Sequence, residues 1–236
     1  PLPNAEAERR AVPATVGPPR IGLLVHAAVE RASLDPSVPA NPAADRALAQ
    51  QVLAEKGQTE SVAALEGLIV ATLAALRAAA AVLGATGEPV REVPFVLGLG
   101  EGALQGVIDL VVPVAGGLHV VDLKTHLLAP GALGLWAAYY QPQLDAYALA
   151  LETLTGQPVL GRHLAVPAAG ALVTLPGAFD ALEARGRLGR LADALAMGAR
   201  GPARACATCG WSDLCRVGQA VKGAPAEAQG EGVATS

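Results

Sequence analysis

Hydrophobic positions along the chain change their spacing near residue 90, from a helical period to short runs typical of strands. Before this point apolar residues recur three and four positions apart, which predicts helices. After it, apolar runs bounded by glycine-rich turns predict strands, interrupted by two further helical segments. We predict helices over residues 21–32, 43–55, 61–83, 139–154 and 179–197, and strands over residues 90–99, 104–114, 118–124, 159–166 and 171–175.

The order of these elements predicts an α/β fold with a mixed central sheet flanked by helices. The turns at 100–103 and 115–117 are short enough for hairpins, so the first three strands should form an antiparallel meander. Pro142 is expected in the first turn of its helix, where a missing N–H costs little. We expect a linker or flexible segment over residues 1–19, the main domain over 20–200, a cysteine knuckle packed on it over 201–220, and a disordered tail over 221–236.

Composition limits the class of protein. The 236 residues suffice for one domain with a sizeable core, which must be filled by Ala, Leu and Val because 52% of the chain is hydrophobic and only 3% aromatic. The apolar segment 61–83 contains Glu66 and Arg77, so we expect a buried or amphipathic helix and no membrane partner. The first twenty residues lack the apolar run of a signal peptide, which favours a cytoplasmic location. A net charge of −4 argues against a protein that coats DNA non-specifically.

Two carboxylates and a lysine lie on neighbouring predicted strands. Asp109 ends the run Gly-Val-Ile-Asp, and Asp122 is followed two positions later by Lys124. Residues 122 and 124 share one face of a strand, and the carbonyl of Leu123 between them can also point at a cation. Oxygen ligands with a neighbouring cation suit Mg²⁺ or Mn²⁺ and phosphodiester hydrolysis. An exposed strand end with Asp and Lys is the alternative, and the second aspartate favours the metal site.

Further polar residues could contribute to this site. His26 lies on a predicted helix with Glu30 four residues later on the same face, and imidazole is an acceptable ligand for Mn²⁺. Glu92 lies near the start of the first strand, where it could orient a ligand or water, or simply be solvated. Gln143 and Tyr147 share one face of the helix that follows the third strand, where they could reach a phosphate or orient Lys124, or form an ordinary polar edge.

All three cysteines of the chain, Cys206, Cys209 and Cys215, lie within ten residues. This clustering favours a metal or cluster site over a pair of buried thiols, and a disulfide would leave one cysteine unpaired.

These pieces together resemble the PD-(D/E)xK nuclease superfamily, and within it the RecB-like nuclease domain of helicase–nuclease recombination enzymes such as RecB, AddA and AddB. CRISPR-associated adaptation nucleases contain the same domain. The resemblance covers residues 21–217 and rests on five motifs in the family's order: Gly22 to His26, Glu92 to Phe95, Gly106 to Asp109, Val121 to Thr125, and Gln143 to Tyr147.

The resemblance implies a restriction-endonuclease-like fold and a role for each motif residue. His26, Asp109, Asp122 and the Leu123 carbonyl would bind the metal, and Lys124 would be the catalytic lysine. Gln143 and Tyr147 would support the site. The remaining histidines, His119, His126 and His163, match no family site, and His119 should lie on the face of its strand opposite Asp122.

In the iron–sulfur branch of this family, a similar C-terminal cysteine triplet binds a [4Fe–4S] cluster together with a cysteine upstream of the histidine helix. No cysteine precedes Cys206 here, and such clusters normally have four thiolate ligands. The fourth ligand could lie in a longer protein of which this chain is a domain, another group could supply it, or the knuckle could hold zinc or nothing.

The resemblance therefore predicts a Mg²⁺- or Mn²⁺-dependent DNA nuclease, expected to act as an exonuclease on single strands or duplex ends and to leave 5′-phosphates. It would serve DNA repair or recombination, with a helicase subunit or domain as partner. One alternative is a catalytically silent module with the same fold that binds DNA or docks on a helicase. Another is a zinc-knuckle interaction protein in which the motifs are accidental.

Overall fold

The structure, a computed structural model, describes residues 2–100, 102–127 and 131–196, with side chains through residue 193. The chain divides into two compact units, Pro1–Leu188 and Gly189–Ser236. The boundary lies inside helix α6 (Ala181–Ala196), and the central sheet with the helices packed on it belongs to the first unit. The predicted knuckle and tail at 201–236 lie outside the described residues.

A five-stranded mixed sheet forms the centre of the first unit, with the strands in sequence order from β1 to β5. Neighbouring strands are antiparallel except β3 and β4, which are parallel and are connected through helix α5. This confirms the predicted mixed sheet and the antiparallel meander. The strands are β1 (Val90–Leu99), β2 (Gly102–Val114), β3 (Gly117–Leu123), β4 (Val159–Val166) and β5 (Ala171–Thr174).

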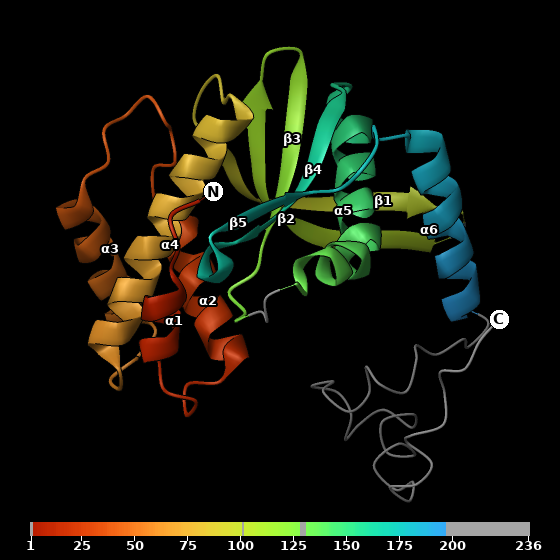
Figure 1. The fold of residues 1–236 in the computed structure, drawn as a ribbon. Helices are drawn as coiled ribbons and strands as arrows, with labels where there is room; N and C mark the ends of the chain where they lie inside the picture. The colour runs from red at the N-terminus through yellow and green to blue at the C-terminus, as the bar shows by residue number, and fades with distance from the viewer. Residues whose placement is uncertain (1, 101, 128–130, 197–236) are drawn as a thin grey trace, which may run out of the picture. The chain divides into compact units, whose positions relative to one another are not determined.

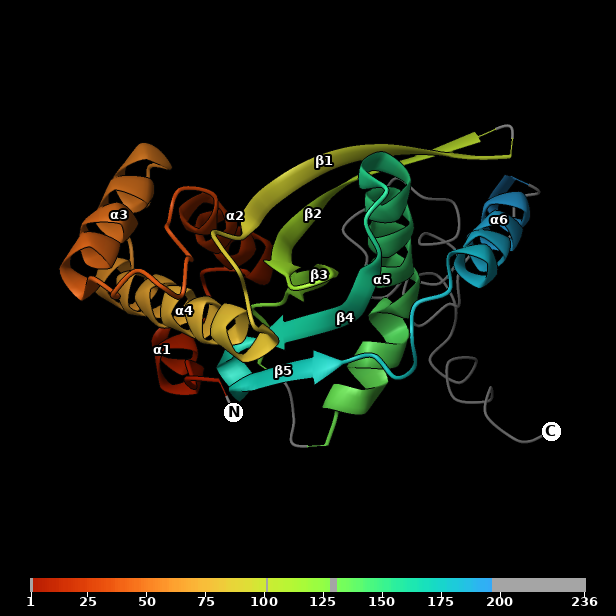
Figure 2. The same ribbon diagram turned by 90° about the horizontal axis from the view of Figure 1, so that it is seen from above.

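Helices cover both faces of the sheet (Figures 1 and 2). The four N-terminal helices form a layer on one side of the sheet, and the core that they share includes Leu110, Val112, Val121 and Leu123 of the strands. The third of these helices packs on the second and the fourth. Helix α5 packs on the other face, against Ile108 and Val120 among others. The helices are α1 (Glu6–Ala11), α2 (Pro18–Val29), α3 (Pro42–Glu55), α4 (Val62–Leu83) and α5 (Leu133–Thr155), with a short 3-10 turn η1 (Pro167–Ala169) between β4 and β5.

The N-terminal segment is part of the folded body, so the prediction of a linker over residues 1–19 was wrong. Helix α1 lies within it, and the side chains of Leu2, Val12 and Val16 are buried. Its proline and charge content suggested a linker, but its leucine and both of its valines are buried. The Leu2 N–H donates to the carbonyl of Gly170, which ties the segment to the turn before β5.

Helix α4 is long and apolar enough to cross a membrane by length and composition alone. Its buried face instead packs against α1, α2, α3 and β2, as expected for a core helix. Arg77 of this helix forms two short hydrogen bonds, of 2.6 and 2.7 Å, with the carboxylate of Asp45 on α3. This paired arrangement satisfies a carboxylate that is only 6% exposed.

Helix α5 begins earlier than predicted, at Leu133, so Pro142 lies inside the helix and not in its first turn. Proline has no N–H to donate to the carbonyl of Ala138, and its ring crowds that carbonyl. The helix changes direction between its first turns and the remainder (Figure 1), as expected for a proline kink. Two segments of one helix can therefore face different parts of the sheet.

Candidate metal centre

Asp109 and Asp122 are neighbours on the antiparallel strands β2 and β3, next to the pair formed by Leu110 and Val121. Asp122 is fully buried and Asp109 is 9% exposed. The N–H of Leu123 donates to Oδ2 of Asp109 over 2.7 Å, which fixes the orientation of this carboxylate. The backbone of the Asp-x-Lys motif therefore positions the carboxylate of Asp109 on the neighbouring strand β2.

A second group of ligand atoms includes His26, in the last turn of α2, and Glu92 of β1. Nδ1 of His26 lies 2.9 Å from Oε1 of Glu92 and 3.9 Å from Oδ1 of Asp109. The three side chains can each offer one ligand atom within 4.8 Å of the others. The structure thus brings together the histidine and first aspartate predicted as ligands, and it places beside them Glu92, for which the sequence left open a role in orienting a ligand or water and simple solvation.

Glu92 has an unusual backbone conformation. Its φ of +48° lies in the left-handed region, which is unfavourable for a residue with a long side chain. The β1–β2 ladder pairs Arg91 with Leu110 and Val93 with Ile108, and leaves Glu92 and Asp109 unpaired between them. Such strain persists only where surrounding structure enforces it, and here it accompanies the contact of the Glu92 carboxylate with His26.

Lys124 directly follows β3, and its N–H extends the pairing with β4 by donating to the carbonyl of Ala165. Its Nζ lies 3.1 Å from Oδ1 of Asp122, with hydrogen-bond geometry, and 2.8 Å from Oδ2, as a close charge pair. The same Nζ lies 4.3 Å from the centre of the Tyr140 ring. The lysine is thus held between a buried carboxylate and an aromatic face.

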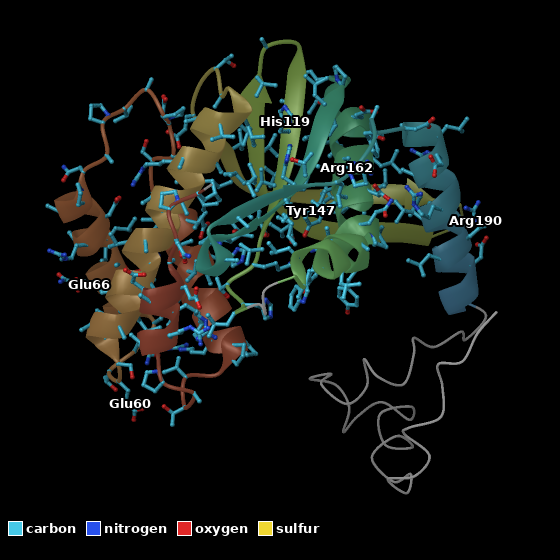
Figure 3. The ribbon with its side chains drawn as sticks, viewed as in Figure 1. Glu60, Glu66, His119, Tyr147, Arg162 and Arg190 are labelled. Carbon is cyan, nitrogen blue, oxygen red and sulfur yellow. The ribbon has the colours of Figure 1, made fainter. Side chains whose placement is uncertain are left out.

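Gln143 and Tyr147 are joined by a hydrogen bond of 2.6 Å from Nε2 to the phenol oxygen. Tyr147, which lies on α5 (Figure 3), also packs edge-to-face on Phe95 with ring centres 5.7 Å apart. The Phe95 ring covers Gly106, where an added Cβ would come within 2.9 Å of it. The glycine of the Gly-x-Ile-Asp motif therefore leaves room for the ring that supports Tyr147.

Burial and like charge shift the pKa values of the carboxyl groups upward. Burial and the neighbouring Asp122 raise the pKa of Asp109 to about 7. The pKa of Asp122 is also raised, chiefly by burial and against the effect of Lys124. The hydrogen bond to Glu92 raises the pKa of His26, and burial together with the Asp122 charge raises the pKa of Tyr140 to about 12. When no metal is bound, ionisation of the two buried carboxyl groups is therefore energetically unfavourable.

The residues present suit a hard divalent cation. Carboxylate oxygens and one imidazole are the donors that Mg²⁺ and Mn²⁺ accept. Oδ2 of Asp122 is buried and has no hydrogen bond within the part of the chain that the structure describes, but Nζ of Lys124 lies 2.8 Å from it as a charge pair. The case for a cation therefore rests on the donor set: two buried carboxylates on adjacent strands with an imidazole and a further carboxylate beside them.

A family model described as the PD-(D/E)XK nuclease superfamily matches residues 4–216. The chain belongs to this superfamily. The match includes all the motif residues discussed above, and the superfamily membership implies phosphodiesterase chemistry and a DNA substrate.

Similarity to named proteins is more limited. The chain is 39% identical over 61 residues to an ATP-dependent helicase/nuclease subunit of Acetivibrio thermocellus, and equally so to the corresponding protein of Desulforudis audaxviator. It is 32% identical over 112 residues to that of Levilactobacillus brevis. These alignments cover 26–40% of the chain and only 5–9% of the relatives. The crystal structure of SSO0001 aligns with 82% of the chain and 85% of its own length at 17% identity and a TM-score of 0.43.

Several residues beside this candidate site were not singled out from the sequence. Trp136, Tyr139 and Tyr140 lie on the first turns of α5, and Tyr140 contacts Lys124 directly. The signal was the concentration of aromatic residues after the Asp-x-Lys motif in a chain that has only 3% of them. Arg9 was also missed, because residues 1–19 were expected to be a linker. Its Nε donates to the carbonyl of Thr125, over 3.0 Å.

The remaining predicted residues lie away from this group of side chains or outside the described residues. His119 packs against His163, with 2.7 Å between Nδ1 and Nε2, on the face of β3 opposite Asp122, as predicted. Burial lowers the pKa of both imidazoles. Leu123 contacts Asp109 through its N–H, and the ligand role of its carbonyl stays a prediction. Cys206, Cys209 and Cys215 lie outside the described residues.

The Glu92–His26 contact gives a direct prediction. Because the hydrogen bond to Glu92 is the largest cause that raises the pKa of His26, the change Glu92→Gln should lower that pKa. An NMR titration of the imidazole resonances in metal-free protein measures the shift. Glu60→Gln, at an exposed glutamate more than thirty positions from both His26 and Glu92 in the sequence, serves as the matched control and should leave the titration unchanged. An unaltered His26 pKa in Glu92→Gln would show that the contact does not exist in solution.

Proposed function

We propose that this chain is a Mg²⁺- or Mn²⁺-dependent deoxyribonuclease that hydrolyses phosphodiester bonds at the Asp109–Asp122–Lys124 site. The observation that carries the proposal is the contact of Lys124 with a buried aspartate, beside a second buried aspartate fixed by the same strand. A lysine at the end of a strand is ordinarily solvated. Here its side chain is 15% exposed, which suits a group that acts on a bound substrate.

The roles of the residues follow from their contacts. His26, Asp109 and Asp122 would hold the cation, with Glu92 orienting His26 or acting as a further ligand. A bound cation supplies a Lewis acid that lowers the pKa of water and offsets phosphate charge. Lys124 would position the attacking water and neutralise charge at the scissile phosphate. Asp122 and Tyr140 hold the ammonium group in place, and Tyr147 with Gln143 would support the wall of the site.

Cleavage of labelled single- and double-stranded DNA, with EDTA, Mg²⁺ or Mn²⁺, tests this function. We expect strand cleavage with either metal and none with EDTA, and products with 5′-phosphates that a ligase accepts. Metal-independent binding without cleavage would instead favour the catalytically silent module. End-labelled linear DNA compared with covalently closed circles decides whether the activity is the exonuclease expected from the resemblance.

We also propose that the nuclease acts with a helicase, in repair or recombination. The relatives that it matches are named helicase/nuclease subunits, and the chain itself has a net charge of −4, which gives little general affinity for DNA. A motor that delivers single strands would supply that affinity. Tight binding of DNA by this chain alone, with a steep dependence on salt, would contradict this partnership.

We also propose a structural role for the cysteine triplet. By resemblance, Cys206, Cys209 and Cys215 would bind an iron–sulfur cluster as a structural clamp remote from hydrolysis. Iron, sulfide and zinc analysis of protein purified without oxygen distinguishes a cluster, a zinc site and free thiols.

A further inference from the structure

A continuous group of aromatic rings lies beside Lys124. His126 packs against Trp136 with ring centres 4.8 Å apart, Trp136 against Tyr140 at 5.5 Å, and Tyr140 against Tyr139 at 5.0 Å. All three tyrosines of the chain and one of its two tryptophans are thus in or next to the site, counting Tyr147. We call His126, Trp136, Tyr139 and Tyr140 the aromatic group.

The aromatic group is not part of the hydrophobic core. Tyr139 is 70% exposed, and the other three side chains are partly exposed. Leu135, on the same turns of α5, is 77% exposed. A rigid aromatic surface left open to solvent costs free energy unless a ligand covers it. The core of this chain is built almost entirely from aliphatic residues, so packing does not explain why the rings gather here.

Two cations border the aromatic group. Lys124 lies against the face of Tyr140, and Arg9 is held against Thr125, the residue before His126. Both cations are close enough to His126 to depress the pKa of its imidazole, after the larger effect of burial. A surface with exposed rings and flanking cations matches a polynucleotide strand, whose bases stack and whose phosphates carry charge.

We infer that the aromatic group is a base-stacking platform for single-stranded DNA, which seats nucleotides adjacent to the scissile phosphate. The inference rests on the proposed nuclease function and names its preferred substrate. Tyr139 and Trp136 offer ring faces to unpaired bases, while Lys124 and Arg9 contact the phosphates on either side. Bases inside a duplex are already stacked on one another and are not available to these rings, so the platform selects single strands.

Removal of one ring should weaken binding of single strands by roughly 5- to 150-fold, the range observed for base–aromatic stacking. Tyr139→Ala is the first variant, because an exposed side chain can be removed without unfolding the protein, and Trp136→Ala is the second. Tyr139→Phe keeps the ring and should restore affinity. Leu135→Ala, an exposed residue on the same turns, is the matched control and should bind as wild type does.

Fluorescence anisotropy with a labelled single-stranded oligonucleotide in EDTA measures binding without cleavage. A second oligonucleotide carries abasic residues at successive positions. At the platform positions, abasic residues should weaken wild-type binding as much as Tyr139→Ala does, and should have little further effect in that variant. In the metal-dependent cleavage assay, the variants should raise KM for single strands and leave kcat nearly unchanged.

Loss of affinity that is equal for normal and abasic oligonucleotides, or equal for single strands and duplex, would overturn the platform. So would wild-type affinity in both Tyr139→Ala and Trp136→Ala. Because binding is measured in EDTA, this result is independent of the cleavage assay. Absence of cleavage by wild type would count against the proposed function, whereas ring-independent binding counts against the platform alone.

Discussion

Replacement of Lys124 with alanine should reduce metal-dependent cleavage of DNA by about 10²–10³-fold, as is usual when a preorganised charge donor is removed from an active site. The Asp122 carboxylate and the Tyr140 ring hold the ammonium group in place. Chemistry should be affected more than binding, because one charge contributes little to the total affinity for a strand. The loss should therefore appear in kcat, measured under single-turnover conditions with saturating enzyme.

Two further variants make this result specific. Lys124→Gln retains most of the side-chain length and fills the same space beside Tyr140, so a comparable loss would assign the effect to the charge. Lys56→Ala removes an exposed lysine at the end of α3 and should cleave as wild type does. Lys124→Ala also leaves Asp122 without its cation, so circular dichroism must show that the fold is retained. Cleavage by Lys124→Gln at the wild-type rate would remove Lys124 from the mechanism.

Replacement of Asp109 with asparagine should abolish cleavage and metal binding, and should stabilise the metal-free protein at pH 8. Asparagine can still accept the hydrogen bond from the Leu123 N–H. It removes a charge whose burial, beside Asp122, is unfavourable. Each kcal/mol of relief raises Tm by roughly 2–4 °C in a protein of this size, so calorimetry should detect an increase of several degrees. Titration with Mn²⁺ measures the loss of binding.

The pH dependence of the wild type follows from the same carboxyl group. The pKa of Asp109 rises from an ordinary 3.8 to about 7 on folding, so the folded state holds this proton more tightly than the unfolded state. Its stabilising contribution is complete below pH 4 and is lost as pH rises through 7. The Tm difference between Asp109→Asn and metal-free wild type should therefore grow between pH 4 and 8. Added Mg²⁺ should raise the wild-type Tm at pH 8 and have little effect at pH 5.

A Tm difference that stays constant across this pH range would contradict the raised pKa of Asp109. Asp193→Asn, at an exposed aspartate in α6, provides the comparison for the general effect of removing one negative charge. It should change neither metal binding nor the pH dependence.

Much of the fold follows from periodicity in the sequence. The alternation of residue types and the glycine-bounded runs predicted β1 at its observed bounds and the other strands within a residue or two. The pattern is clear because alternate side chains of the strands pack on opposite faces of the sheet, against the N-terminal helices or against α5. The adjacency of Asp109 and Asp122 followed from a hairpin between their strands. The N-terminal segment was misjudged because its buried residues, such as Val12 and Val16, are too sparse to show a period, and they reach the core only through tertiary contacts.

The details of the site depend on features that a linear pattern does not contain. The left-handed φ of Glu92 turns its carboxylate toward His26, whereas ordinary strand geometry would not indicate this contact. The predicted helix began at Tyr139 and so left out Trp136, which α5 places one turn before Tyr140 and in contact with its ring. Pro142 was expected to lie near the start of the helix, whereas it lies inside the helix and bends it.

The bend at Pro142 divides α5 into a part that carries Trp136, Tyr139 and Tyr140 and a part that carries Gln143 and Tyr147. Backbone cooperativity is interrupted at this point because one helical hydrogen bond is missing. Sequence changes in the first part need not disturb the second, which is anchored by the buried ion pair of Asp145 with Arg162. Substitutions at exposed positions of residues 133–139 should therefore leave the backbone that carries Gln143 and Tyr147 in place, so the two parts of the helix can be altered separately.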